Sequence, residues 1–466
     1  MMRKLILATL VALLGTWSAA LAQLEVVVDR ADLKPTPIAI PTFEAIGVDP
    51  DIAQQISDVI RADLESTGLF TVTPEEAHIQ KDLNIEVAPR FADWKIIQAD
   101  ALVVGTVEQI SRDGNQLIRG SVRMWDVYGE ELMRFEDSAG RQVSGRRFTT
   151  TPADIRRIAH KIADAIYSRL TGEDGYFDTR IVYIAESGTP GNRIKKLAIM
   201  DSDGANAQEL TDGTSLTLTP RFSPEAQQIT YVSYEGDPSQ FGPFGSPRVY
   251  LFDLRRGRQE VIGRQGVMSV AGRFSPDGDT LLYAELRNGN SDLYTMDLQT
   301  RQTRRLTDHP AIDISPSMSP DGRSIVFTSD RGGSQQLYIM NIDGTARSCP
   351  SGGRDIACRI TFGSGGYSAP VWSPRGDLIA FTKQASRKFH IGVIGIDGRG
   401  ERLLTESSLV DEGPDWSPNG RVIVFSRQRG PERRTSLWSV DLTGRNLRQL
   451  PTPTDASDPA WSPLLD

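Results

Sequence analysis

The chain has 466 residues and a formal net charge of −8, with 24% charged and 7% aromatic residues. This length suggests about three units of ~150 residues rather than one ordinary domain. The acidic balance argues against nucleic acid as the main partner, because binding to phosphates requires a basic face.

The first 22 residues have the pattern of a secretory signal peptide. Arg3 and Lys4 form a positive start, an apolar run follows at Leu5–Leu14, and Ala20–Ala22 gives a small-x-small cleavage site. The alternative is a membrane anchor, but glycine and hydroxyl residues interrupt the apolar run. We therefore expect an exported protein whose mature chain begins at Gln23.

Residues 23–34 form a short strand-prone segment ahead of the first predicted domain. Two interpretations stay open: an edge strand of that domain, or a mobile arm that a partner takes up by strand addition. The residues that we assign to partner binding in this arm are Leu24, Glu25, Val26, Val27, Val28, Asp29, Arg30 and Asp32.

Residues 35–170 are predicted to form a separate α/β domain. The predicted elements are a strand at Ile38–Pro41, a helix at Pro50–Leu64, a strand at Phe70–Thr73, a short helix at Phe91–Gln98, strands at Ala101–Ile110, Gln116–Val127 and Glu131–Asp137, and a helix at Pro152–Leu170. Asp49 is the expected N-cap of the first helix, and Thr151 that of the last. Residues 171–179, which contain two glycines, are the expected linker.

A Ser-Pro unit recurs about every 45 to 55 residues in the remainder of the chain. Its serines are Ser223, Ser275, Ser319, Ser373, Ser417 and Ser462, each preceded by Phe, Met or Trp. In the clearest copy, Pro320, Asp321 and Gly322 are suited to a tight turn, and a short strand follows. Period-2 patterning at this spacing is typical of propeller blades and not of helical repeats.

The two ends of the repeat region complement each other. Ile181–Ala185, Leu197–Met200 and Leu210–Thr211 read as second, third and fourth strands without a first strand. Pro459–Pro463 reads as a first strand with nothing after it. The sequence therefore predicts a six-bladed β-propeller over residues 180–466, closed by the C-terminal strand, which leaves no open sheet edge.

The two cysteines, Cys349 and Cys358, are close in the sequence. In an exported chain this pair favours a local disulfide, with two free thiols as the alternative. A metal site there would need further ligands, and the chain has only four histidines.

The patterns of common enzymes are absent from the sequence. There is no Gly-x-Ser-x-Gly motif and no phosphate-binding glycine loop, and the histidines lack metal-type spacing. Asp201-x-Asp203-Gly204 resembles the start of a calcium loop, but the downstream acidic ligand is missing, which favours a tight turn. The repeated serines are expected to cap turns.

Loops that enter the first strands and loops between second and third strands should meet at one mouth of the channel. A solvated surface of mixed charge is one interpretation, and a polar funnel for a protein partner or a small ion is the other. The mouth residues that we assign to partner binding are His309, Asp313, Arg331, Tyr367, Lys383, Arg387, Asp411, Glu412, Arg429, Asp455 and Asp458.

The signal peptide, the α/β domain and the six Ser-Pro repeats together resemble the TolB family of the Tol-Pal cell-envelope system. Three units depart from the Asp-Gly form of the repeat, at Glu225-Ala226, Arg375-Gly376 and Asn419-Gly420. The resemblance implies a monomeric, non-enzymatic adaptor in the periplasm that supports envelope integrity and outer-membrane constriction at division.

The resemblance also implies partners for the two predicted surfaces. The lipoprotein Pal would bind the propeller mouth, and TolA would bind the arm, with room for other outer-membrane or peptidoglycan-associated proteins. No nucleic acid and no cofactor are expected, although the binding of a structural calcium ion in the channel is left open as an alternative. Two rival functions remain, a metal-dependent hydrolase or lyase that uses the channel and a glycan-binding module of the cell wall.

Overall fold

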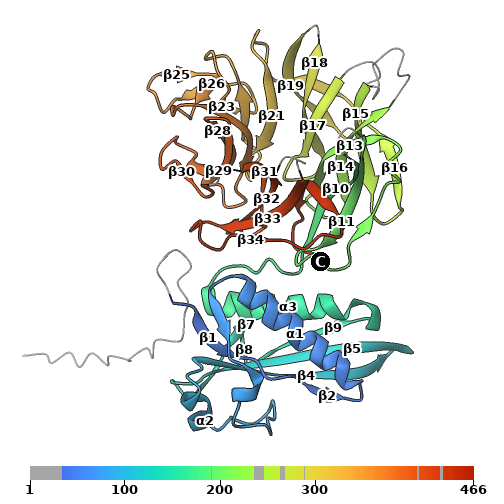
Figure 1. The fold of residues 1–466 in the computed structure, drawn as a ribbon, viewed down its shortest axis with the longest axis vertical. Helices are drawn as coiled ribbons and strands as arrows, with labels where there is room; N and C mark the ends of the chain where they lie inside the picture. Colours follow the sequence, from blue (N-terminus) through green and yellow to red (C-terminus); the bar gives the residue numbers. More distant parts are fainter. Residues whose placement is uncertain are drawn as a thin grey trace, which may run out of the picture.

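The structure is a computed structural model that describes residues 34–189, 192–235, 246–262, 268–287, 289–406, 409–430 and 434–465. The predicted signal peptide and almost all of the predicted arm lie outside these residues. An N-terminal domain is followed by a C-terminal β-propeller, which lies above it in Figure 1. Within the described part of the chain, no helix is long and apolar enough to cross a membrane.

The N-terminal domain is built on one mixed sheet. Its elements are β1 (Thr36–Ala39), β2 (Glu44–Ile46), α1 (Pro50–Ser66), β3 (Phe70–Val72), η1 (Glu75–Ala77), α2 (Phe91–Ile96), β4 (Ala101–Arg112), β5 (Asn115–Asp126), β6 (Glu131–Met133), β7 (Phe135–Glu136), β8 (Gln142–Val143), β9 (Arg146–Thr150), η2 (Pro152–Asp154) and α3 (Ile155–Thr171). The strand order is β3-β1-β4-β5-β6, with β2 beside β4 and β9 beside β5. β1 pairs in parallel with β3 and β4, whereas β4 and β5 form a long antiparallel hairpin.

Helices cover both faces of this sheet because successive residues of β4 point to opposite sides. Val103 packs into the core that contains α1 and α3, while Leu102 packs with Trp94 of α2 on the other side. At Gly120 of β5 an added Cβ would lie 2.9 Å from the side chain of Ile162, so glycine lets α3 approach closely. Figure 1 shows α1 and α3 on the side of the sheet that faces the propeller.

The predicted elements of this domain are largely confirmed, with three differences. The helix expected from Pro152 begins as the 3-10 turn η2, and Thr151 makes no side-chain capping bond there. The single strand expected at Glu131–Asp137 is divided, because β7 leaves the main sheet and pairs with β8. β2 and β9 were missed because neither strand has a buried residue and β9 is polar apart from Phe148, which weakens the hydrophobic signal.

The propeller consists of antiparallel sheets. Over the described residues, four sheets have four strands each and one has eight. The four-stranded sheets contain β10 (Arg180–Thr189), β11 (Asn192–Asp201), β12 (Gln208–Glu209) and β35 (Asp455–Trp461); β13 (Leu216–Phe222), β14 (Gln228–Glu235), β15 (Ser246–Asp253) and β16 (Arg258–Val261); β17 (Met268–Phe274), β18 (Thr280–Arg287), β19 (Asn290–Asp297) and β20 (Thr303–Arg305); and β21 (Asp313–Met318), β22 (Ser324–Ser329), β23 (Gln336–Asn341) and β26 (Ala357–Arg359).

The eight-stranded sheet spans the last two repeats. It contains β27 (Gly366–Trp372), β28 (Leu378–Ala385), β29 (Lys388–Gly395), β30 (Arg402–Leu403), β31 (Val410–Trp416), β32 (Val422–Arg429), β33 (Arg434–Asp441) and β34 (Arg448–Gln449). Its halves are joined by a single parallel pair between Phe389 and Val410. A separate small hairpin, β24 (Arg347–Ser348) and β25 (Arg354–Asp355), is inserted in the preceding sheet.

The repeated turn has the hydrogen bonds that its sequence predicts. The Ser319 amide donates to the carbonyl of Ser324, and the Ser319 Oγ accepts from the Ser324 amide at 2.9 Å. Gly322 has a φ of 69°, which glycine adopts without strain. Equivalent Oγ contacts are made by Ser223, Ser275 and Ser417. The predicted role of these serines as turn caps is confirmed.

The last Ser-Pro pair makes the same contacts with the opposite end of the propeller. The Ser462 amide donates to the carbonyl of Arg180 at 2.8 Å, and the Ser462 Oγ accepts from the Arg180 amide at 2.8 Å. Arg180 is the first residue of β10, and β35 pairs antiparallel with β10. The Trp461 indole donates to the Thr179 hydroxyl at 2.8 Å. We call this junction between β35 and β10 the seam.

The first strands of the repeats share a bulge. The pairing register shifts in each of β13, β17, β21, β27, β31 and β35. Residues with positive φ lie four positions before the serine, at Thr219, Ser315, Ala369, Gly413 and Asp458. A shared local distortion of this kind identifies structurally equivalent strands.

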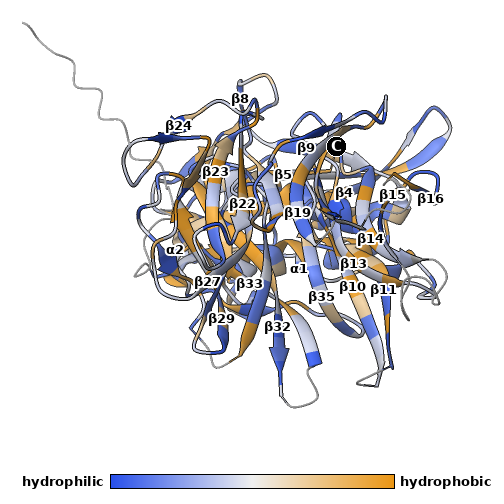
Figure 2. Ribbon diagram, turned by 90° about the horizontal axis from the view of Figure 1, so that it is seen from above, coloured by the Kyte–Doolittle hydropathy of each residue, from blue (hydrophilic) through white to orange (hydrophobic). Residues whose placement is uncertain are grey.

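The hydrophobic cores of the propeller lie between adjacent sheets. One cluster joins Ala380 and Val393 to Trp416, Phe425 and Val440 of the next repeat. Figure 2 shows the hydrophobic residues concentrated on the strands inside the molecule, with hydrophilic residues toward the loops. Packing between neighbours is typical of a propeller, in which no single sheet has a core of its own.

Candidate protein-binding site

The predicted mouth residues differ in their accessibility. Four have exposed side chains, four are half-buried and three are buried. The exposed residues are His309, Arg387, Glu412 and Arg429; the half-buried ones are Arg331, Lys383, Asp455 and Asp458; and the buried ones are Asp313, Tyr367 and Asp411. Only the first two groups offer side-chain surface to a docking partner.

Two of the buried carboxylates are held in ion pairs inside the propeller. Asp313 accepts two hydrogen bonds from one guanidinium nitrogen of Arg331, at 2.8 and 3.0 Å. Asp411 accepts bonds of 2.6 and 2.7 Å from Arg427, whose guanidinium also lies over the ring of Trp438. These aspartates therefore stabilise the wall of the mouth and position the arginines.

A third buried group at the mouth is polar but uncharged. The Tyr367 hydroxyl lies 2.9 Å from both carboxylate oxygens of Glu401, and the Lys383 ammonium lies over the Tyr367 ring. Burial raises the pKa of Tyr367, so the phenol stays protonated and donates to the carboxylate. Glu401 was missed in the sequence because it lies far along the chain from both partners.

The seam carries a charged cluster that the sequence did not reveal. Glu186 of β10 accepts from Lys195 at 2.8 Å and from Arg193 at 2.9 Å, and Asp455 pairs with Arg193 and Arg434. Burial raises the pKa of Glu186, but hydrogen bonds from Lys195 and Ser457 outweigh it and hold the pKa below its usual range. The sequence could have predicted this cluster only through the expected pairing of the final strand with the strands that begin the repeat region, which brings Asp455 close to Glu186 and Arg193.

Glu412 and Asp458 form an acidic spot near the bulges. Burial and the neighbouring charge of Asp458 raise the pKa of Glu412. Asp458 accepts a hydrogen bond from the Thr219 amide at 3.3 Å. A calcium ion in the channel remains a prediction.

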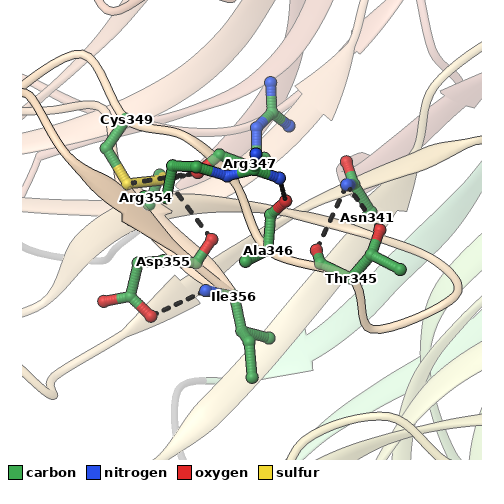
Figure 3. The surroundings of a disulfide bond; sticks show 9 residues. Asn341, Thr345, Ala346, Arg347, Cys349, Arg354, Asp355 and Ile356 are labelled. Carbon is green, nitrogen blue, oxygen red and sulfur yellow. Dashed lines mark hydrogen bonds between the residues drawn. A yellow bond between two sulfur atoms is a disulfide. The ribbon is translucent and has the colours of Figure 1, made fainter.

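The predicted disulfide between Cys349 and Cys358 is confirmed, with Cα atoms 5.1 Å apart. Cys358 belongs to the outer strand β26, and Cys349 follows β24, so the bond fastens the inserted hairpin to its blade. Figure 3 shows the Arg347 carbonyl beside the cysteines and the Arg354 side chain donating to the Ala346 carbonyl. Half-buried Arg347 and exposed Ile356 flank this loop.

The two domains are joined by polar and aromatic contacts. Glu173 in the linker forms ion pairs with Arg375 and Arg421 of two successive propeller turns. The Asn446 amide donates to the Ser66 carbonyl at the end of α1. Tyr176 lies between the Tyr167 ring of α3 and the Trp461 ring of β35, with centroids 5.7 and 5.9 Å away.

Comparisons with known proteins cover nearly the whole chain. The family profile "TolB amino-terminal domain" matches residues 24–133, and the profile "TolB beta propeller domain" matches residues 167–465. A Tol-Pal system protein TolB from Gluconobacter oxydans (strain 621H) is 44% identical over 443 residues, which are 94% of this chain and 88% of that protein. The chain belongs to the TolB family. The crystal structure of TolB from Acinetobacter baumannii, at 28% identity, has a TM-score of 0.75 and covers 95% of this chain and 100% of that one.

Membership of the TolB family confirms the resemblance found in the sequence. It places the protein in the Tol-Pal system of the cell envelope, where its role is that of an adaptor with protein partners. The TolB family is non-enzymatic, so the alternative of a hydrolase or lyase is wrong.

Proposed function

We propose that this TolB family protein links Pal to TolA in the periplasm. Pal binds the propeller mouth, and TolA binds the arm formed by residues 23–34. The observation that carries the proposal is the family match over both domains, since Tol-Pal membership requires partners within that system. The signal-peptide pattern at residues 1–22 supports the periplasmic location.

The propeller has six blades in this proposal, and β35 closes the ring. Three observations support it: the one-pair junction within the eight-stranded sheet, the shared bulge of the first strands, and the turn hydrogen bonds that Ser462 makes with Arg180. The domain boundaries follow, with the α/β domain at 35–170, the linker at 171–179 and the propeller at 180–466.

Among the described residues, the inter-domain contacts of two successive propeller turns lie at the other ends of the first strands, which leaves the mouth suited to docking. The inter-domain contacts of Arg375, Asn419 and Arg421 come from turns after the first strands, whereas the mouth loops lie at the other ends of these strands. Among the exposed mouth residues, Arg387 lies at the tip of the β28–β29 hairpin, and Arg429 lies over the ring of Trp438. Arginine beside an aromatic ring is a frequent hot-spot combination.

Charge reversal at the mouth tests the proposal. The variant His309→Glu, Arg387→Glu, Arg429→Glu should bind soluble Pal at least about tenfold more weakly by calorimetry, because two exposed positive charges are reversed and a negative charge is added at a third exposed position. The matched control is Arg256→Glu with Arg399→Glu, two exposed arginines in turns that follow third strands. Unchanged Pal affinity in the mouth variant, with the fold intact, would contradict the assignment.

The arm is tested separately. Removal of residues 23–33 from the mature protein should abolish capture of TolA and leave the folded domains intact by circular dichroism. Capture of TolA by the shortened protein would show that TolA binds elsewhere.

A further inference from the structure

A histidine and two aspartates from different domains converge where α3 meets the propeller. Among the described residues, His160, Asp201 and Asp203 each offer one ligand atom, and these atoms all lie within 4.8 Å of one another. His160 comes from α3 of the N-terminal domain, while the aspartates come from the end of β11 and the turn that follows it. We refer to these three residues as the interdomain cluster.

The imidazole of His160 is held as in a metal centre. Its Nδ1 lies 2.7 Å from a carboxylate oxygen of Asp63 on α1, and both side chains are 3% exposed. Its Nε2 is buried and has no hydrogen-bond partner. A carboxylate that accepts from one ring nitrogen orients the ring and leaves the other nitrogen as the ligand, which is the usual arrangement of metal-binding histidines.

The turn after β11 fixes the two aspartates. The Gly204 amide donates to the Asp201 carbonyl at 2.9 Å, with Gly204 at φ 94°, and the Ala205 amide donates to the Asp203 Oδ1 at 3.0 Å. The predicted tight turn is thus present. The sequence could not show that its carboxylates face a histidine more than forty residues away.

The charges around the cluster favour a cation. Three carboxylates, those of Asp63, Asp201 and Asp203, surround the imidazole. Two arginines adjoin the cluster: Arg156 pairs with Asp203 and has its Nε 4.0 Å from Asp201, and Arg180 has its Nε 3.9 Å from Asp201. Asp201 also accepts a hydrogen bond of 2.7 Å from the Asn206 side-chain amide. A cavity of about 410 Å³, lined by Arg156, Asp203 and residues of α1 that include Asp51 and Asp58, opens to solvent beside Asp203.

We propose that the interdomain cluster binds a divalent transition-metal ion, with Zn²⁺ as the preferred ion. One imidazole nitrogen and two carboxylates are a donor set that suits Zn²⁺, whereas Ca²⁺ requires six or more oxygen ligands. Arg156 gives up its contact with Asp203 when the ion binds. The bound ion connects α3 directly to the turn after β11, so it ties the N-terminal domain to the propeller.

Zinc titration of the untagged mature protein, followed by calorimetry and thermal melting, tests the proposal. The wild type should bind one Zn²⁺ and melt at higher temperature with it, while Ca²⁺ at the same concentration has no effect. Asp203→Asn and His160→Gln should each weaken Zn²⁺ binding at least about tenfold. Arg156→Gln should strengthen it several-fold, because the competing cation is removed.

Asp343→Asn is the matched control for Asp203→Asn. Asp343 occupies the corresponding turn after β23 and accepts from the Thr345 amide at 2.9 Å, but it is not part of the cluster. The Asp343→Asn variant should bind Zn²⁺ with the same affinity as the wild type. The proposal is overturned if the wild type binds no Zn²⁺, if binding persists in Asp203→Asn, or if Asp343→Asn weakens it equally. Because Asp203 is on the surface, Asp203→Asn remains informative if His160→Gln fails to fold.

Discussion

Several charged residues in this protein pair with residues from distant parts of the chain. Arg273 of β17 reaches Asp415 of β31 at 3.2 Å, and Asp415 also accepts from the Trp461 amide. Burial lowers the pKa of Arg273 to about 10, with neighbouring Arg221 adding to the effect. The pair thus connects two different sheets of the propeller.

Asp164 makes the stability of the protein depend on pH. Its oxygens accept from the amides of Phe177 and Asp178, at 2.8 and 3.0 Å, in a cavity of about 520 Å³. Burial raises the pKa of Asp164 to about 7. The folded state therefore holds this proton more tightly than the unfolded state, so the contribution of Asp164 to stability is present below about pH 4 and is lost as the pH rises to 7.

We expect this loss to amount to on the order of 2 kcal/mol, because water in the cavity reduces the full effect of the shift. Urea unfolding of the wild type and of Asp164→Asn, between about pH 4 and pH 8, measures it. The wild type should lose stability relative to the variant as the pH rises. Parallel profiles would show that Asp164 is ionised throughout.

Sequence reasoning predicted best the elements whose ends are fixed by residues only a few positions away in the chain. The helix α1 begins after Asp49, whose side chain accepts from the Asp51 amide, and the Ser-Pro turns close on their own residues. The ion pairs of the mouth could not be predicted in the same way. Asp411 and Arg427 are opposite each other only because their strands pair with a shifted register, and hydropathy patterns do not encode such a shift.

In the proposed six-bladed ring, closure depends on the seam. Deletion of residues 455–466 removes β35, exposes the edge of β10 and leaves Tyr176 without its contact to Trp461. We expect the shortened protein to unfold at lower denaturant and over a broader range, because blades that have lost a neighbour open independently. Circular dichroism and hydrogen exchange of β10 measure the effect.

Deletion of residues 464–466 alone is the control. This shorter deletion retains β35 and removes the hydrogen bond from the Leu465 amide to the Asp178 carbonyl. A protein without residues 455–466 that unfolded as sharply and as late as this control would show that the final strand is dispensable.

At the scale of the whole molecule, the two domains form one packed unit. One hydrophobic cluster contains Leu64 and Ile166 of the N-terminal domain together with Ile181, Val424 and Trp461 of the propeller. Glu173 adds ion pairs to Arg375 and Arg421 at the edge of this contact. The linker is therefore a structural part of the interface.

Glu173→Gln should loosen this interface without unfolding either domain. Glu173 and Arg421 are only partly exposed, so we expect the two ion pairs together to contribute about 1 kcal/mol, which corresponds to a change of about fivefold in the opening equilibrium. Limited proteolysis within residues 171–179 should accelerate by this factor, while the melting temperature changes little. Glu130→Gln, which removes an exposed pair with Lys95 inside the N-terminal domain, should leave the cleavage rate unchanged.

The seam also has a consequence for biogenesis. The ribosome synthesises β10 long before it reaches the residues of β35. The sheet of β10, β11 and β12 therefore remains without its fourth strand until the last segment of the polypeptide is synthesised. Interrupted translation would release a product lacking this strand, so only chains that include β35 complete the sheet of β10, β11 and β12.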